Sequence, residues 1–149
     1  MQIVDWGSLL KIGIAYVVAL PVGWEREKHE RSAGLRTFPL VAVSTCGFML
    51  VANRAFGGDI AAESRTMQGL IAGIGFIGAG TIMKVQRTVH GTATAASLLA
   101  TAIIGMAVAY GLYDLALVLS GLSLFTLRVF TAWRLIREEQ PPPKNHESQ

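Results

Sequence analysis

The sequence predicts an all-α fold, a polytopic membrane helix bundle of about five transmembrane helices, and three observations lead to it. The 149 residues are 52% hydrophobic and only 15% charged, with a mean hydropathy of +0.46. One water-soluble domain of this length could not bury so much apolar surface. The apolar residues also fall into runs of membrane-spanning length, and the basic residues collect between these runs on one side.

The predicted transmembrane domain covers residues 1–137. A helix that crosses the hydrocarbon core needs about 20 residues, and about 17 are enough. The apolar stretch from Thr92 to Leu127 is too long for one span, so it is expected to turn near residues 110–114, "YGLYD". The five expected spans are residues 8–24, 35–52, 67–83, 92–110 and 114–133. The polar, proline-rich residues 138–149 are expected to form a disordered cytoplasmic tail.

The basic residues predict the orientation of these spans. Arg54 and Arg65 would lie on one side of the membrane, and Lys11 would reach that interface from the first span. The other lysines and arginines would lie on the opposite side: Arg26, Lys28, Arg31, Arg36, Lys84, Arg87, Arg128, Arg134, Arg137 and Lys144. The positive-inside rule then places the N-terminus outside and the C-terminus in the cytoplasm. The first residues, "MQIVDW", lack the basic region of a cleavable signal peptide, so the first span is expected to be retained.

The stretch "GIGFIGAGTIM" at residues 73–83 begins with the G-x-G-x-x-G pattern of dinucleotide-binding loops. Such a loop needs a preceding strand and a following acid, but this one lies in an apolar run with no acid between Glu63 and Asp114. Helix packing explains the glycines better, because small residues let helices approach closely in lipid. The third span is therefore expected to be the central packing helix, and its candidate contact residues are Gly69, Gly73, Gly75, Gly78 and Gly80. A polar lining, to which Thr94 of the fourth span would contribute, remains the alternative.

At these residues the chain resembles the MgtC/SapB family of bacterial inner-membrane proteins. The residues that carry the resemblance are "ERE" at 25–27, "AGLRT" at 33–37, Arg65 before "GIGFIGAGTIM", and "VHGTATAASL" at 89–98. Four positions depart from the family pattern. Thr92 stands where the family has leucine, and Ala93 replaces a polar residue. Leu99 stands where a tryptophan is often found, and Gln68 follows Arg65 by three residues where four are expected. Longer members carry a C-terminal cytoplasmic domain, and this chain resembles a short form without it.

The resemblance implies a multi-pass protein of the bacterial inner membrane that adapts cells to magnesium limitation or host-like stress. Some family members are linked to virulence and to inhibition of the proton-driven ATP synthase. The expected partners are the lipid bilayer and another membrane complex or a second copy, with helix contacts as the means of regulation. Nucleic acid is not expected, because the basic residues form no single patch.

A cation carrier or channel, for magnesium or another ion, is the alternative function. Magnesium prefers oxygen ligands such as carboxylates, and acids inside a span mark ion paths. All ten acids fall outside the middle of the expected spans, so threonine hydroxyls or backbone carbonyls would have to line a path. The sequence predicts no catalytic residues, metal ligands or cofactor, and we expect a protein that is not an enzyme.

The charged residues at the ends of the spans are the remaining candidates for a functional site. Glu25 or Glu27 is expected either to pair with Arg36, fixing the first two spans, or to contact a partner. Asn53 and Arg65 are expected either to anchor the opposite interface or to bond across the loop between the second and third spans.

Overall fold

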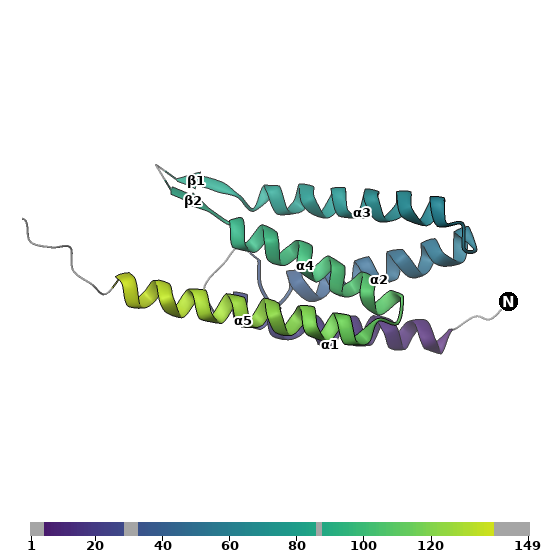
Figure 1. The fold of residues 1–149 in the computed structure, drawn as a ribbon, viewed down its shortest axis with the longest axis horizontal. Coiled ribbons are helices and arrows are strands. Elements are labelled where there is room, and N and C mark those ends of the chain that lie inside the picture. Colours follow the sequence, from purple (N-terminus) through teal and green to yellow (C-terminus); the bar gives the residue numbers. More distant parts are fainter. Residues whose placement is uncertain (1–4, 29–32, 86–87, 139–149) are drawn as a thin grey trace, which may run out of the picture.

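The computed structural model describes residues 5–28, 33–85 and 88–138, with side chains as far as Val129. Five α-helices follow one another: α1 (Trp6–Glu27), α2 (Thr37–Phe56), α3 (Ile60–Gly80), α4 (Thr92–Ala109) and α5 (Tyr113–Glu138). They run up and down along one axis, so α1, α3 and α5 end where α2 and α4 begin (Figure 1). We call this the Glu25 end of the bundle, and the opposite end, which contains the start of α1, the Asp5 end. The expected tail residues 139–149 lie outside the described residues.

The central helix is α4, which packs against each of the other four helices. In the most apolar 18-residue stretch of α4, 61% of the residues are buried. The corresponding shares are 39% for α2 and 22% for α1. The expectation that the third span is the central packing helix is therefore wrong. A helix surrounded by other helices is apolar on all sides, and α4 has no charged residue, whereas α3 carries Glu63 and Arg65 in its first half.

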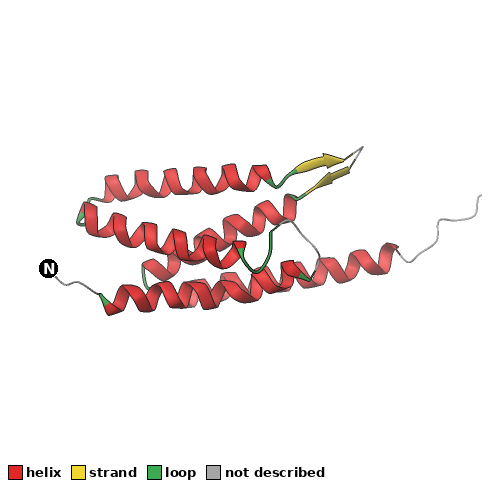
Figure 2. Ribbon diagram, turned by 180° about the vertical axis from the view of Figure 1, so that it is seen from behind, coloured by secondary structure: helices red, strands yellow, loops and turns green. Residues whose placement is uncertain are grey.

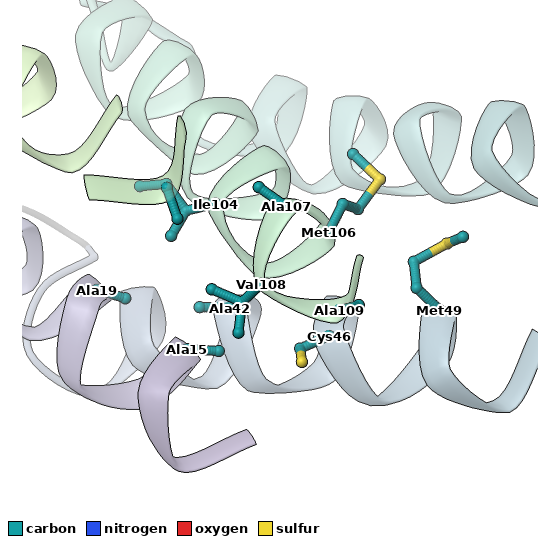
Figure 3. Close-up of a cluster of buried hydrophobic side chains, with 11 residues drawn as sticks. Ala15, Ala19, Ala42, Cys46, Met49, Ile104, Met106, Ala107, Val108 and Ala109 are labelled. Carbon is teal, nitrogen blue, oxygen red and sulfur yellow. The ribbon is translucent and has the colours of Figure 1, made fainter. Parts of the chain in front are cut away.

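The main core lies where α4 meets α1 and α2. In Figure 3, Val108 of α4 lies among Ala15 of α1 and Ala42 and Cys46 of α2. Alanines on α1 and α2 allow the helix backbones to come close, which gives the dense packing that stabilises helices in lipid. Cys46 is fully buried in this core.

Helices α2 and α4 approach each other closely at Gly105 of α4. A Cβ atom added at this position would overlap the Thr45 hydroxyl and the Ala42 carbonyl oxygen of α2. Thr45 already donates a hydrogen bond to the Ala42 carbonyl at 3.1 Å, so its hydroxyl is satisfied without a partner on α4. Glycine is thus required at residue 105 by the space between the helices.

Helix α3 is longer at its start than the expected third span. It begins at Ile60 because Asp59 caps it, accepting hydrogen bonds from the backbone N–H groups of Ala61 and Ala62 at 2.9 and 3.1 Å. Capping by aspartate and the acidic Glu63 in the first turn favour a helix start here. Hydropathy alone cannot show such a start, because these turns are polar.

A short β-hairpin, which the all-α expectation did not include, joins α3 to α4. Strands β1 (Met83–Val85) and β2 (Thr88–His90) pair antiparallel, with Lys84 opposite Val89. At the Glu25 end the hairpin extends beyond the adjoining ends of α3 and α4 (Figure 2). β-branched residues favour the extended conformation here, and the left-handed Gly91, at φ 92°, leads into α4. Met83, expected in the third span, therefore lies in a strand.

Three helices of the described chain are long and apolar enough to cross a membrane: α1, α2 and α4. This finding and the five-helix bundle agree with the predicted class of membrane helix bundle. The number of five spans and their orientation stay predictions.

We expect Gly105→Ala to lower the free energy of unfolding in detergent by about 2 kcal/mol, because the added methyl group must push α2 and α4 apart. Gly47→Ala on α2 is the matched control, since a Cβ there meets no atom within 4 Å. Thermal unfolding of the two purified variants measures the difference. Equal stability of both variants would contradict the role assigned to Gly105.

Candidate functional site

The candidate site is a cluster of charged and polar side chains at the Glu25 end, made of Glu25, Arg26, Thr94 and Arg128. We call it the charge cluster. Glu25 and Arg26 follow one another in the last turn of α1, and both residues are only 7% exposed. Consecutive residues of a helix point about 100° apart. Glu25 therefore contacts α5 while Arg26 contacts α4.

Arg26 joins α1 to α4. Its Nη2 atom donates a hydrogen bond to the hydroxyl of Thr94, which is 2% exposed. Hydrogen bonds to a charged group contribute about 1.5–3 kcal/mol, because the charged partner strengthens them. The dipole of α1 favours a cation in its last turn, whereas the N-terminal end of α4 disfavours one. The Thr94 hydroxyl offers the guanidinium an acceptor at this otherwise unfavourable position.

Glu25 joins α1 to α5. Its Oε2 atom accepts a hydrogen bond from Nε of Arg128 at 3.0 Å, in an ion pair whose side chains are 8% and 65% exposed, respectively. A buried carboxylate without a partner would be strongly destabilising. The ion pair therefore links α1 to α5. The Glu25 carboxylate is buried, whereas the Arg128 side chain stays exposed at the surface of the bundle.

Glu27 secures the connection from α1 to α2. Its Oε2 atom accepts a hydrogen bond from the backbone N–H of Leu35 at 3.0 Å. Gly34 leaves room for this carboxylate, because a Cβ at that position would displace Oε2 of Glu27. The expected pairing of Glu25 or Glu27 with Arg36 is thus replaced by contacts to Arg128 and to the Leu35 backbone. The Arg36 side chain is exposed at the start of α2.

At the Asp5 end, neither of the predicted residues forms the expected bond. Asn53 and Arg65 are exposed, and no hydrogen bond joins their side chains in the described chain. The neighbouring Arg54 instead donates to the carboxylate of Asp5 and, at 2.8 Å, to the hydroxyl of Ser8. This contact connects α2 to the N-terminal cap of α1. Hydrogen bonding from Ser8 is the main cause that lowers the pKa of Asp5 below its usual value.

Two further contacts hold the Asp5 end of α4. The Nζ atom of Lys11 donates a hydrogen bond to the carbonyl of Ala109, the last residue of α4, at 2.8 Å. A cation is favourable there because the last carbonyls of a helix carry partial negative charge. Tyr110 donates its hydroxyl to Glu63 of α3 at 3.2 Å. Polar contacts therefore fix α4 at both of its ends.

Of the five candidate glycines of α3, one contacts another helix. A Cβ at Gly78 would lie 3.4 Å from that of Ala95 on α4, which is ordinary contact. Gly69, Gly73, Gly75 and Gly80 would meet no atom of the described chain within 4 Å. The only residues that α3 buries are Ile74 and Gly78. Among the described residues, Gly78 is therefore the one of these five glycines at which α3 packs against another helix.

Sequence reasoning found Glu25 and Thr94 but missed their partners. Arg26 and Arg128 were counted only as positive charges on the cytoplasmic side. A signal was present for Arg128, because it is a lone charge between Leu127 and Val129 in an apolar run, where charges usually have a partner. Among the described residues no group of three or more histidines, cysteines and acids is placed to hold a metal ion.

These features define a class of protein: a helical membrane protein whose central helix is held at both ends by polar contacts to its neighbours. The family model described as the MgtC family matches residues 12–134. The chain therefore belongs to the MgtC family, which confirms the resemblance seen in its sequence.

Named relatives agree with this membership. The chain is 38% identical over 139 residues to "Protein SrpB" of Synechococcus elongatus, covering 85% of this chain and 76% of the relative. It is 32% identical over 128 residues to "Putative magnesium transporter YhiD" of Escherichia coli K12, covering 82% of this chain and 60% of that protein. "Protein SapB" of Bacillus subtilis is 33% identical over 117 residues, which are 74% of this chain and 50% of SapB. No solved structure matches the chain.

We expect Thr94→Val to lower the free energy of unfolding by about 2 kcal/mol, because the Arg26 guanidinium loses a buried acceptor. The control is Thr101→Val on the same helix. Thr101 is also buried, but it donates only to the Ser97 carbonyl of its own helix, at 2.8 Å. Its loss should change stability little. The measurement is unfolding in mild detergent, and equal effects of the two substitutions would argue against the Arg26 contact.

Proposed function

We propose that this chain is a non-enzymatic regulator that binds a membrane protein complex, or a second copy of itself, through α3. The observation that carries the proposal is the open glycine face of α3. Ile74 and Gly78 face α4, and at about 100° per residue Gly69, Gly73 and Gly80 project from roughly the opposite side of the helix.

The glycine face is suited to a helix of another protein. In lipid, exposed apolar side chains such as Phe76, which is 81% exposed, gain little from leaving one apolar environment for another. Close backbone approach is what favours helix association there, and it requires small residues. Gly69 and Gly73 have the four-residue spacing of the GxxxG motif, and Gly80 projects from the same side of the helix, with Phe76 interrupting the face between Gly73 and Gly80.

The charge cluster supports a structural role over a catalytic one. Arg26 bonds to Thr94, and Glu25 bonds to Arg128, so these groups already hold the helices together. We infer that the cluster holds α1 against α4 and α5. It thereby stabilises the position of α4, the helix against which α3 packs. The family resemblance suggests the setting: a multi-pass protein of the bacterial inner membrane, acting in magnesium limitation, stress adaptation or virulence. The distribution of basic residues favours a C-terminus in the cytoplasm.

We expect Gly73→Leu and Gly80→Leu to weaken association with the partner by about tenfold or more, because each leucine keeps the helices apart. The experiment cross-links the tagged protein in native membranes and identifies the captured proteins by mass spectrometry. Gly121→Leu is the matched control, since Gly121 is an exposed glycine of α5 whose Cβ would meet no atom within 4 Å. Undiminished capture by both α3 variants would refute the proposal.

A cation carrier is the second candidate function, and the name of the relative YhiD favours it. The polar residues of α4 would have to line its path. Thr94, however, accepts a hydrogen bond from the cationic Arg26, which would repel a magnesium ion. Thr101 and Ser97 donate to carbonyls of their own helix. For these reasons we place regulation first.

For the purified protein in liposomes we expect no magnesium flux above that of empty liposomes. A fluorescent magnesium indicator inside the vesicles provides the measurement. Flux that is retained in Gly73→Leu but lost in Thr94→Val and Thr101→Val would reverse the order of the two candidates.

A further inference from the structure

A groove on the outer surface of the bundle lies between α1 and α5 at the Glu25 end. Its volume is about 410 Å³, and it is open along one side. Leu20, Pro21 and Trp24 of α1, together with Leu35, form an apolar lining. Arg128 of α5 is the one charged residue in the lining. The groove is therefore apolar along its length and cationic at one position.

Arg128 keeps most of its hydrogen-bonding capacity. It uses Nε to bind the buried Glu25, and its side chain is 65% exposed. In the part of the chain that the structure describes, no hydrogen bond is formed by its two terminal amino groups. An arginine held in this way presents a fixed pair of donors, and such a pair matches the oxygens of a phosphate group.

The charge that faces the groove favours an anion. Arg128 is the one charged side chain that lines the groove, and its guanidinium is positive. Trp24, which is 57% exposed, lies in the last turns of α1. Tryptophan at the end of a membrane helix is typical of the level of the lipid headgroups. Arg128 therefore lies near the depth at which lipid phosphates occur.

We propose that the groove binds an anionic phospholipid of the leaflet at the Glu25 end. The headgroup phosphate accepts hydrogen bonds from the terminal amino groups of Arg128. One acyl chain lies along Leu20, Pro21, Trp24 and Leu35. Basic residues at the cytoplasmic surface attract anionic lipids in general, and the groove adds a fixed place for one of them. The inference does not depend on the regulatory function, because it involves α1 and α5 and not the glycine face of α3.

The experiment compares binding of phosphatidylglycerol and phosphatidylcholine with identical acyl chains to the detergent-purified protein by native mass spectrometry. We expect the protein to prefer phosphatidylglycerol, and Arg128→Gln to reduce that preference by about tenfold, as the loss of a charge-assisted hydrogen bond predicts. Arg54→Gln is the control, since Arg54 is also an exposed arginine paired with an acid, but at the Asp5 end. It should keep the preference of the unchanged protein.

A second measurement keeps the proposal testable if Arg128→Gln does not fold. In a Trp6→Phe, Trp133→Phe background, phosphatidylglycerol with brominated acyl chains should quench the fluorescence of Trp24 more than brominated phosphatidylcholine does. Leu20→Trp, made for the mass-spectrometric assay, should fill the groove and weaken binding while Arg128 stays in place. Equal binding of the two lipids, an unchanged preference in Arg128→Gln, or displacement by inorganic phosphate regardless of acyl chains would each overturn the proposal.

Discussion

Close contact between α2 and α4 at Gly105 is the constraint on which the rest of the bundle depends. In a membrane, hydrophobicity does not drive helices together, so a stable bundle needs backbones that approach closely. Gly105 permits this approach over Thr45 and Ala42, and α4 thereby becomes the helix that every other helix contacts. The alanine-rich faces of α1 and α2 complete the same core (Figure 3).

The position of α4 explains why charges are tolerated inside the Glu25 end. Burial of a carboxylate and a guanidinium is favourable only when each has a partner with good geometry. Because α4 is central, Thr94 reaches Arg26 of α1, and α5 on the neighbouring side brings Arg128 to Glu25. These bonds fix how the helices are rotated and shifted relative to one another, because a core of alanine and glycine alone would allow several arrangements.

The sequence predicted the class of fold and most helix positions, because the length and hydropathy of each apolar run depend only on consecutive residues. It could not predict which helix is central. The glycines of α3 and Gly105 of α4 look alike in sequence, and only the packing shows that Gly105 is enclosed while Gly73 is open. The partner of Glu25 was missed for a related reason, since Arg128 lies 103 positions away in the chain. Patterns of neighbouring residues do not show which residues far apart in the chain are in contact.

The two proposed binding surfaces lie on opposite sides of α4, with α3 on one side and α1 and α5 on the other (Figures 1 and 2). A partner on the glycine face would therefore leave the lipid groove open. The two surfaces nevertheless meet in the first turn of α4, where Ala95 touches Gly78 of α3 and the adjacent Thr94 binds Arg26. A partner that shifts α3 against Ala95 acts on the same turn that holds the charge cluster. The Glu25 end is thus the part of the bundle through which the two surfaces are mechanically connected.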